Sequence, residues 1–149
     1  MMRMTHWAIA ATLPLLVLGN AIRAEDIRPA MEAANMQFLK AFNTPAPADF
    51  VAQYTADAVL FFQGSPPVTG PEAIGQFWEK RIELGVREHT FDIVETATDG
   101  RYAWQVAKTT VRLVRDTEKT LIAGHTVRIF EKQSDGTWKT KVHMWNRLQ

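Results

Sequence analysis

The spacing of hydrophobic residues changes near residue 86, and this change divides the chain into two parts. In the first part, apolar residues recur every three or four positions, as on one face of a helix, most clearly at residues 27–42 and 71–85. In the second part, apolar and polar residues alternate, which is typical of β-strands. We therefore expect helices to precede a run of strands.

The pattern predicts three helices and five strands. The helices are expected at residues 27–42, 48–54 and 71–85, and the strands at residues 57–63, 88–96, 101–115, 119–133 and 137–148. Short polar connectors, TDG, RDTE and SDG, join the last four strands and are suited to hairpins. This order predicts an α+β domain in which helices cover one face of a curved, mainly antiparallel sheet.

Residues 1–24 differ from the rest of the chain. A positively charged start leads into the apolar run WAIAATLPLLVLG, and small residues follow it. This is the order of a secretory signal peptide, and the run is shorter than the roughly 20 residues that span a bilayer as a helix. We expect cleavage near Ala24, with Ala21 as the alternative, and an exported, periplasmic or secreted protein of one domain, residues 25–149. An uncleaved membrane anchor is the second alternative.

Composition narrows the class of partner. The chain has 149 residues, enough for one domain, and its hydrophobic fraction of 46% predicts a packed core. The formal net charge is +1 and both signs are interspersed, so nucleic acid is not expected as a partner. The absence of cysteine excludes disulfides and thiol catalysis, and the histidines have no metal-binding spacing. We expect no metal, no other cofactor and, after signal cleavage, no membrane partner.

Two stretches of the chain resemble a known family. YTADAVLFFQGSPPVTGPEAIGQFW, residues 54–78, and GHTVRIFEKQSDGTWKTKVHMWN, residues 124–146, are similar to stretches of the nuclear transport factor 2-like superfamily. The similarity is to its SnoaL-like, DUF4440-type and ketosteroid-isomerase-related members in particular. It implies a cone-shaped fold, in which three N-terminal helices lie over a strongly bent sheet and leave a central pocket. It also implies a homodimer formed through the sheet.

The chemistry best known on this fold is ketosteroid isomerisation, which needs a carboxylate base and two acids, a Tyr and a protonated Asp. The resemblance places the base at about Phe62, the tyrosine at about Phe38 and the second acid near His125 or Thr126. None of these side chains can take the role it would inherit. We therefore expect a protein that binds a small hydrophobic molecule in an apolar pocket, without an identifiable catalytic set.

Three histidines offer an alternative. His89 and His125 share the alternation of apolar neighbours, which would place them on a face that lines the pocket, or simply in the core with a hydrogen-bond partner. His143 lies between the apolar residues Val142 and Met144, so alternation places it on the opposite face of the strand from them. We expect it at the pocket mouth or on the convex, dimerising face. The alternative is an isomerase, dehydratase or cyclase with His125 or His143 as its base. Three basic residues are candidates to stabilise the developing negative charge: Lys108, Arg112 and Arg128.

Aromatic residues are the other candidates, because ligand cavities are mostly apolar with a few polar groups. The residues expected to line the pocket are Phe38, Phe62, Trp78, Trp104, His125 and Trp145. They favour a small hydrophobic ligand. A third hypothesis is an association module that acts through the surface of its sheet.

Overall fold

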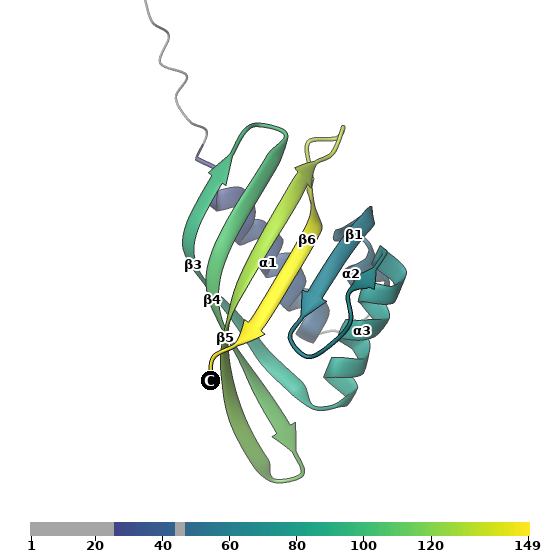
Figure 1. Cartoon of the computed structure of the whole chain (residues 1–149), viewed down its shortest axis with the longest axis vertical. Coiled ribbons are helices and arrows are strands. Elements are labelled where there is room, and N and C mark those ends of the chain that lie inside the picture. Colours follow the sequence, from purple (N-terminus) through teal and green to yellow (C-terminus); the bar gives the residue numbers. More distant parts are fainter. Residues whose placement is uncertain (1–25, 44–46) are drawn as a thin grey trace, which may run out of the picture.

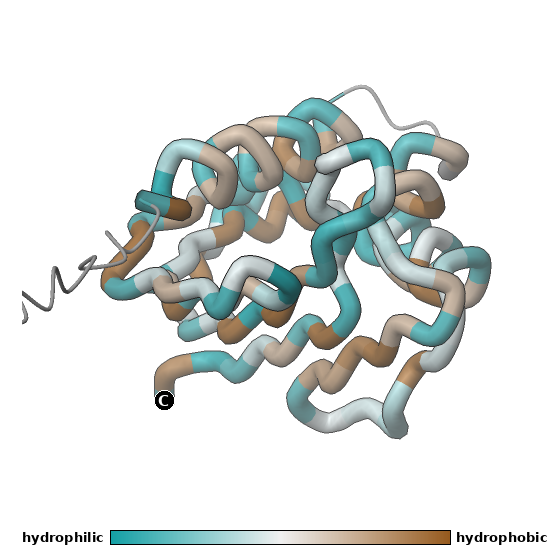
Figure 2. The backbone as a smooth tube through the Cα atoms, turned by 90° about the horizontal axis from the view of Figure 1, so that it is seen from above, coloured by the Kyte–Doolittle hydropathy of each residue, from teal (hydrophilic) through white to brown (hydrophobic). Residues whose placement is uncertain are grey.

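Six strands form one curved sheet, and the helices lie on one side of it (Figure 1). The computed structural model describes residues 26–43 and 47–149. The helices are α1 (Arg28–Asn43), α2 (Pro47–Val51) and α3 (Pro71–Glu83). The strands are β1 (Tyr54–Phe62), β2 (Val68–Thr69), β3 (Val86–Thr98), β4 (Tyr102–Arg115), β5 (Glu118–Lys132) and β6 (Trp138–Arg147). The predicted α+β fold is confirmed, and Figure 2 shows the helices as a layer above the strands.

Two short elements differ from the sequence prediction. The second helix ends at Val51, and Tyr54 begins β1 instead of closing a helix. The backbone N–H of Thr140 in β6 donates to the carbonyl of Gln53 at 2.8 Å, which draws this segment into the sheet. The two-residue strand β2, for which the sequence predicts no counterpart, pairs with β1.

The strands are ordered β2–β1–β6–β5–β4–β3 across the sheet. Strands β3 to β6 form the predicted antiparallel meander. Strand β1 joins this meander in parallel beside β6, with Phe62 opposite Trp145. Because parallel neighbours run in one direction, the C-terminal ends of β1 and β6 meet at the same end of the sheet.

The turn between α3 and β3 brings the end of α3 against β4. Gly85 in this turn has a φ of 97°, a conformation that favours glycine. Its carbonyl accepts a hydrogen bond from the backbone N–H of Val114 at 2.8 Å. A Cβ at residue 85 would lie 2.0 Å from the carbonyl oxygen of Val114, so a larger residue would force the two segments apart. Glycine at this position therefore allows the end of α3 to pack close to the C-terminal end of β4.

A β-bulge interrupts the pairing of β6 with β5. Phe130 of β5 pairs with Thr140, but its neighbour Ile129 pairs with Val142. Lys141 is therefore an extra residue on β6, and an extra residue shifts the alternation of side chains by one position.

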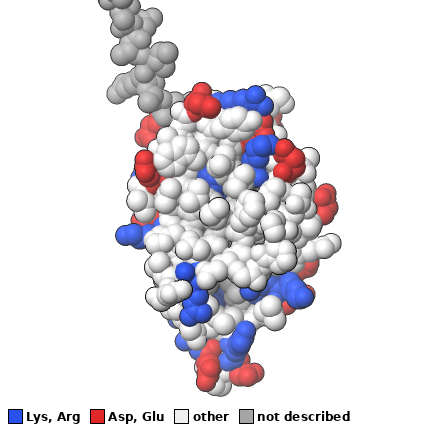
Figure 3. All heavy atoms as spheres, viewed as in Figure 1, with Lys and Arg blue, Asp and Glu red and all other residues white. Residues whose placement is uncertain are grey.

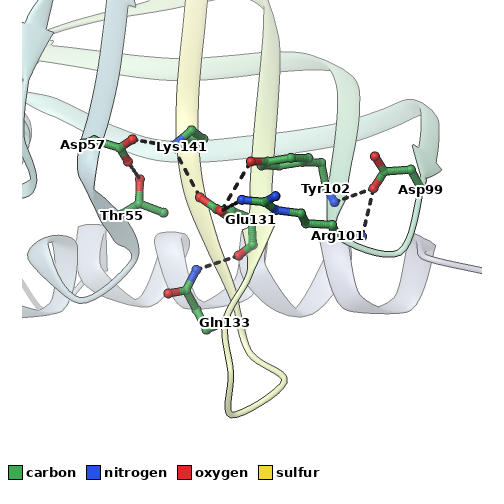
Figure 4. A network of polar contacts seen from close by, with 8 residues as sticks. All are labelled: Thr55, Asp57, Asp99, Arg101, Tyr102, Glu131, Gln133 and Lys141. Atoms are coloured by element: carbon green, nitrogen blue, oxygen red, sulfur yellow. Dashed lines mark hydrogen bonds and ion pairs between the residues drawn. The ribbon is translucent and has the colours of Figure 1, made fainter.

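The bulge places His143 inside the protein. Thr140 and His143, three residues apart, are both buried, with exposed fractions of 0% and 1%. Lys141 forms ion pairs with Asp57 of β1 and Glu131 of β5 (Figure 4). The prediction that His143 lies at the pocket mouth or on the convex face is therefore wrong, because the inserted residue inverts the alternation on which it was based.

The outer, convex face of the sheet has its own apolar surface. In two rows across four strands, the residues that pair with one another are all apolar and partly or fully exposed. We call these eight residues the convex patch: Val59, Val142, Ile129 and Trp104 in one row, and Phe61, Met144, Val127 and Val106 in the next. Figure 3 views this face and shows charged side chains mainly around its margin.

In residues 26–43 and 47–149, no helix is both long and apolar enough to cross a membrane. The predicted signal peptide, residues 1–24, lies outside the described residues and stays a prediction.

Candidate ligand-binding site

A cavity of about 340 Å³ lies at one end of the sheet, between α3 and the adjoining parts of β1, β3, β4, β5 and β6. Three of the predicted pocket residues line it: Phe62, Trp78 and Trp145. Five aliphatic side chains complete most of the wall: Leu84, Val86, Val111, Leu113 and Ile122. A concave, mainly apolar space of this size is typical of small-molecule sites.

Trp145 forms part of the cavity wall and is held from two sides. Its ring stacks on Phe62, with 4.5 Å between centroids and 14° between planes. Its Nε1–H donates to Oγ1 of Thr109 in β4 at 3.0 Å. The indole reaches β4 by crossing β5 at Gly124, where a Cβ would lie 2.8 Å from the ring. The aromatic wall is therefore ordered before any ligand binds, which lowers the entropic cost of binding.

The other three predicted pocket residues lie elsewhere. Phe38 of α1 is fully buried in the core and does not line the cavity. Trp104 and His125 lie on the convex face, away from the cavity. The reason is that the parts of β4 and β5 around Trp104 and His125 turn small or polar residues inward and apolar residues outward. Gln105 and Arg128 are two of these inward residues. The assumption that the apolar side of a strand faces the pocket is therefore wrong for these parts of β4 and β5, although it holds at Val111, Leu113 and Ile122.

Behind the cavity, a chain of hydrogen-bonded side chains links α3, β1 and β6. The indole N–H of Trp78 donates to the hydroxyl of Tyr54 at 2.9 Å, and this hydroxyl lies 2.9 Å from Nδ1 of His143. A hydroxyl that accepts from Trp78 still has its own proton to donate, and Nδ1 of His143 accepts it in the tautomer that carries its proton on Nε2. Burial raises the pKa of Tyr54 to about 12, so the hydroxyl keeps its proton.

Next to this chain lies a buried arginine that has no carboxylate partner among the described residues. Arg128 of β5 is 1% exposed and donates to Oδ1 of Asn35 at 3.0 Å and to Oγ1 of Thr140 at 2.7 Å. Gln105 donates to the same oxygen of Asn35 at 2.9 Å. The guanidinium carbon lies 4.5 Å from the centroid of the Phe130 ring. Burial lowers the pKa of Arg128 to about 10, so a cation remains inside the protein at neutral pH.

Burial and this cation keep the two inner histidines neutral. Desolvation, and secondly Arg128, lower the pKa of His89 to about 3. The same causes, and then His89, hold the pKa of His143 well below its usual value. His89 lines the cavity, and its Nδ1 is buried without a hydrogen-bond partner in the described part of the chain. A histidine with so low a pKa is a poor general base.

The basic residues expected beside a histidine base do not line the cavity. Lys108 is exposed on the convex face, Arg112 pairs with Glu88 at the surface, and Arg128 is buried behind the cavity. Three other arginines, which are not among the predicted site residues, line the cavity: Arg81, Arg115 and Arg147. Alternation along the strand could have identified Arg115 and Arg147, because each lies two positions after a lining residue, Leu113 or Trp145.

Comparison with known families now identifies the class of protein. The sequence profile of the SnoaL-like domain matches residues 36–140, which are 105 of the 149 residues. The chain therefore belongs to the SnoaL-like domain family, and the resemblance found in the sequence is confirmed. No protein with a curated description matches the chain.

Several solved structures share the fold. A ketosteroid isomerase-like protein from Erwinia carotovora atroseptica has a TM-score of 0.71 at 23% identity, over 84% of this chain and 98% of that one. A nuclear transport factor 2-like protein from Novosphingobium aromaticivorans has a TM-score of 0.72 at 12% identity, over 82% of each chain. A protein from Catenulispora acidiphila in complex with S-DNPA has a TM-score of 0.72 at 18% identity, over 81% of this chain and 92% of that one. These likenesses confirm the nuclear transport factor 2-like fold.

Proposed function

We propose that the protein binds a small, largely apolar molecule in the cavity without transforming it. The observation that carries this proposal is the composition of the wall. It contains the stacked rings of Phe62 and Trp145 and five aliphatic side chains, and none of the described lining residues is Asp or Glu. Fixed aromatic rings offer a large apolar contact area and lose little freedom when a ligand binds.

The same wall argues against the alternative of a histidine-dependent enzyme. Acid–base catalysis needs a titratable group within hydrogen-bond reach of the substrate, with a pKa near the working pH. His89 is the histidine that lines the cavity, and its pKa is about 3. His125 and His143, the two candidate bases, are not among the lining residues that the structure describes. We therefore favour binding over catalysis.

Phe62→Ala should weaken binding of the neutral aromatic probe N-phenyl-1-naphthylamine about tenfold, because it removes the ring that stacks on Trp145. Saturable binding to the full chain should raise the probe's fluorescence and the melting temperature. It should also change the emission of Trp78 and Trp145, which line the cavity. Fluorescence titration and a thermal-shift assay measure these effects.

Phe61→Ala is the matched control for this experiment. Phe61 is the preceding residue of β1, but it belongs to the convex patch and is 40% exposed. Its removal should leave the affinity for the probe unchanged. An equal loss in both variants, or no saturable binding to the full chain, contradicts the proposed function.

We also propose that two copies of the chain associate through the convex patch, as the family resemblance implies. The patch gathers eight adjoining apolar side chains, and charged side chains lie mainly around its margin (Figure 3). Contiguous apolar surface rimmed by polar residues is typical of a protein interface. A two-fold axis would bury the patch against an identical one.

Sedimentation of the full chain should therefore give about twice the single-chain mass of 16.9 kDa. Val127→Lys should give the mass of one copy, because it places a charge among the apolar residues that would be buried. Val94→Lys is the control, since Val94 is 54% exposed and lies outside the patch. A full chain that sediments as one copy at high concentration contradicts the dimer.

A further inference from the structure

Three arginines line the cavity, and each comes from a different element. Arg81 lies in α3, one turn after Trp78, while Arg115 ends β4 and Arg147 ends β6. We call them the cavity arginines. None of the described residues around them in the cavity wall is acidic. The whole chain has a formal net charge of only +1, so this local excess is not a by-product of a basic composition.

The cavity arginines also lack acidic partners. Three arginines elsewhere each form an ion pair with a glutamate: Arg28, Arg101 and Arg112. Across the described parts of the chain, no carboxylate lies within ion-pair distance of a cavity arginine. Their charges are therefore available to a ligand that enters the cavity.

Arg81 is placed to meet the end of an aromatic ligand. Its guanidinium carbon lies 4.4 Å from the centroid of the Phe62 ring and 4.9 Å from that of Phe77. Phe62 in turn stacks on Trp145, so the cation and the two rings form one layered wall. Partial burial lowers the pKa of Arg81, but a guanidinium remains charged at neutral pH.

We propose that the ligand is an aromatic carboxylic acid bound as its anion, with its rings against the aromatic wall and its carboxylate held by the cavity arginines. This inference rests on the proposed binding function. A carboxylate matches the planar fork of a guanidinium, which can donate two parallel hydrogen bonds to it. A neutral apolar ligand would instead shield these charges from water without giving them a partner, which is unfavourable.

Two probes of the same shape test this inference, 2-naphthoate and 2-naphthamide. In calorimetric titrations the full chain should bind 2-naphthoate about tenfold more tightly or better. The double variant Arg115→Gln/Arg147→Gln changes two exposed side chains and should leave folding intact. It should weaken 2-naphthoate about tenfold and leave the affinity for 2-naphthamide unchanged.

The matched control is Arg101→Gln/Arg112→Gln, which removes the same net charge away from the cavity. Arg101 lies just before β4, in a polar network at the opposite end of this strand from Arg115 (Figure 4). This control should keep the preference for 2-naphthoate. Equal affinities of the full chain for the two probes, while N-phenyl-1-naphthylamine still binds, overturn the carboxylate inference and leave the proposed function standing. If none of the three probes binds, both are overturned.

Discussion

Lowering the pH from 7 to 5 should reduce the free energy of unfolding by about 2 kcal/mol or more. Burial first, and Arg128 second, lower the pKa of His89 to about 3 and hold that of His143 well below its usual value. In the unfolded chain both imidazoles titrate near 6.5. Below pH 6.5 the unfolded state binds protons that the folded state does not, so stability falls as the pH falls. His89 contributes about 2 kcal/mol of this loss between pH 7 and 5, and His143 adds to it in the same direction.

Urea unfolding at pH 7, 6 and 5 measures this dependence. His89→Phe should remove about 2 kcal/mol of it, because a phenyl ring suits the surrounding Phe38, Phe42 and Phe91 and does not titrate. Four surface carboxylates, of which Glu131 is half-buried, have a lowered pKa and titrate mainly below this window: Asp57, Asp99, Glu131 and Asp135. An unfolding free energy that is constant from pH 7 to 5 would rule out neutral, buried histidines.

Arg128→Ala should lower the free energy of unfolding at pH 7 by about 4 kcal/mol. The substitution opens a space against Phe130 and removes hydrogen bonds to Asn35 and Thr140 in the interior. Arg128→Met should cost only about 1–2 kcal/mol, because methionine fills most of the space and places no charge in the core. Asn35 also keeps its hydrogen bond from Gln105 in both variants.

The control for these variants is Arg112→Ala, which removes an arginine from an ion pair with Glu88 at the surface. Its expected effect is within about 0.5 kcal/mol, because exposed ion pairs contribute little. Urea unfolding of the three variants gives the comparison. If Arg128→Ala is no more destabilising than Arg112→Ala, the buried polar network does not hold β5 against α1.

The arrangement of helices and strands could be predicted because local features determine it. The three-and-four spacing of residues 27–42 corresponds to α1, and Pro71 and Gly85 mark the two ends of α3. The hairpin turns between the last four strands are built from neighbouring residues. None of these features depends on contacts between distant parts of the chain.

The faces of the strands could not be predicted from the same pattern. In β4, Trp104 and Val106 face outward, while Gln105 and Ala107 have no exposed surface. Alternation identifies a strand, but both faces of this sheet carry apolar residues, so it does not say which face the helices cover. In β6, the extra residue Lys141 is defined only by the pairing with β5, which no local pattern reveals.

The candidate site could be predicted only in part, for a related reason. Phe62, Trp78 and Trp145 are large aromatic residues within the stretches that carry the family resemblance, and all three line the cavity. The positions of Tyr54 and Arg128 behind the cavity depend on hydrogen bonds to residues that are distant in sequence, His143 and Asn35. Those contacts exist only once the helices have packed on the assembled sheet.

Adjacent residues of β1 and β6 belong to opposite sides of the sheet. Phe62 and Trp145 line the cavity, whereas the residues just before them, Phe61 and Met144, lie in the convex patch. Because side chains alternate along a strand, one stretch of sequence specifies two surfaces: every second residue belongs to one face of the sheet, and the residues between them belong to the other. Substitutions that alter the cavity and substitutions that alter the convex patch therefore fall on different residues of the same strand, and each surface can change in evolution while the other is kept.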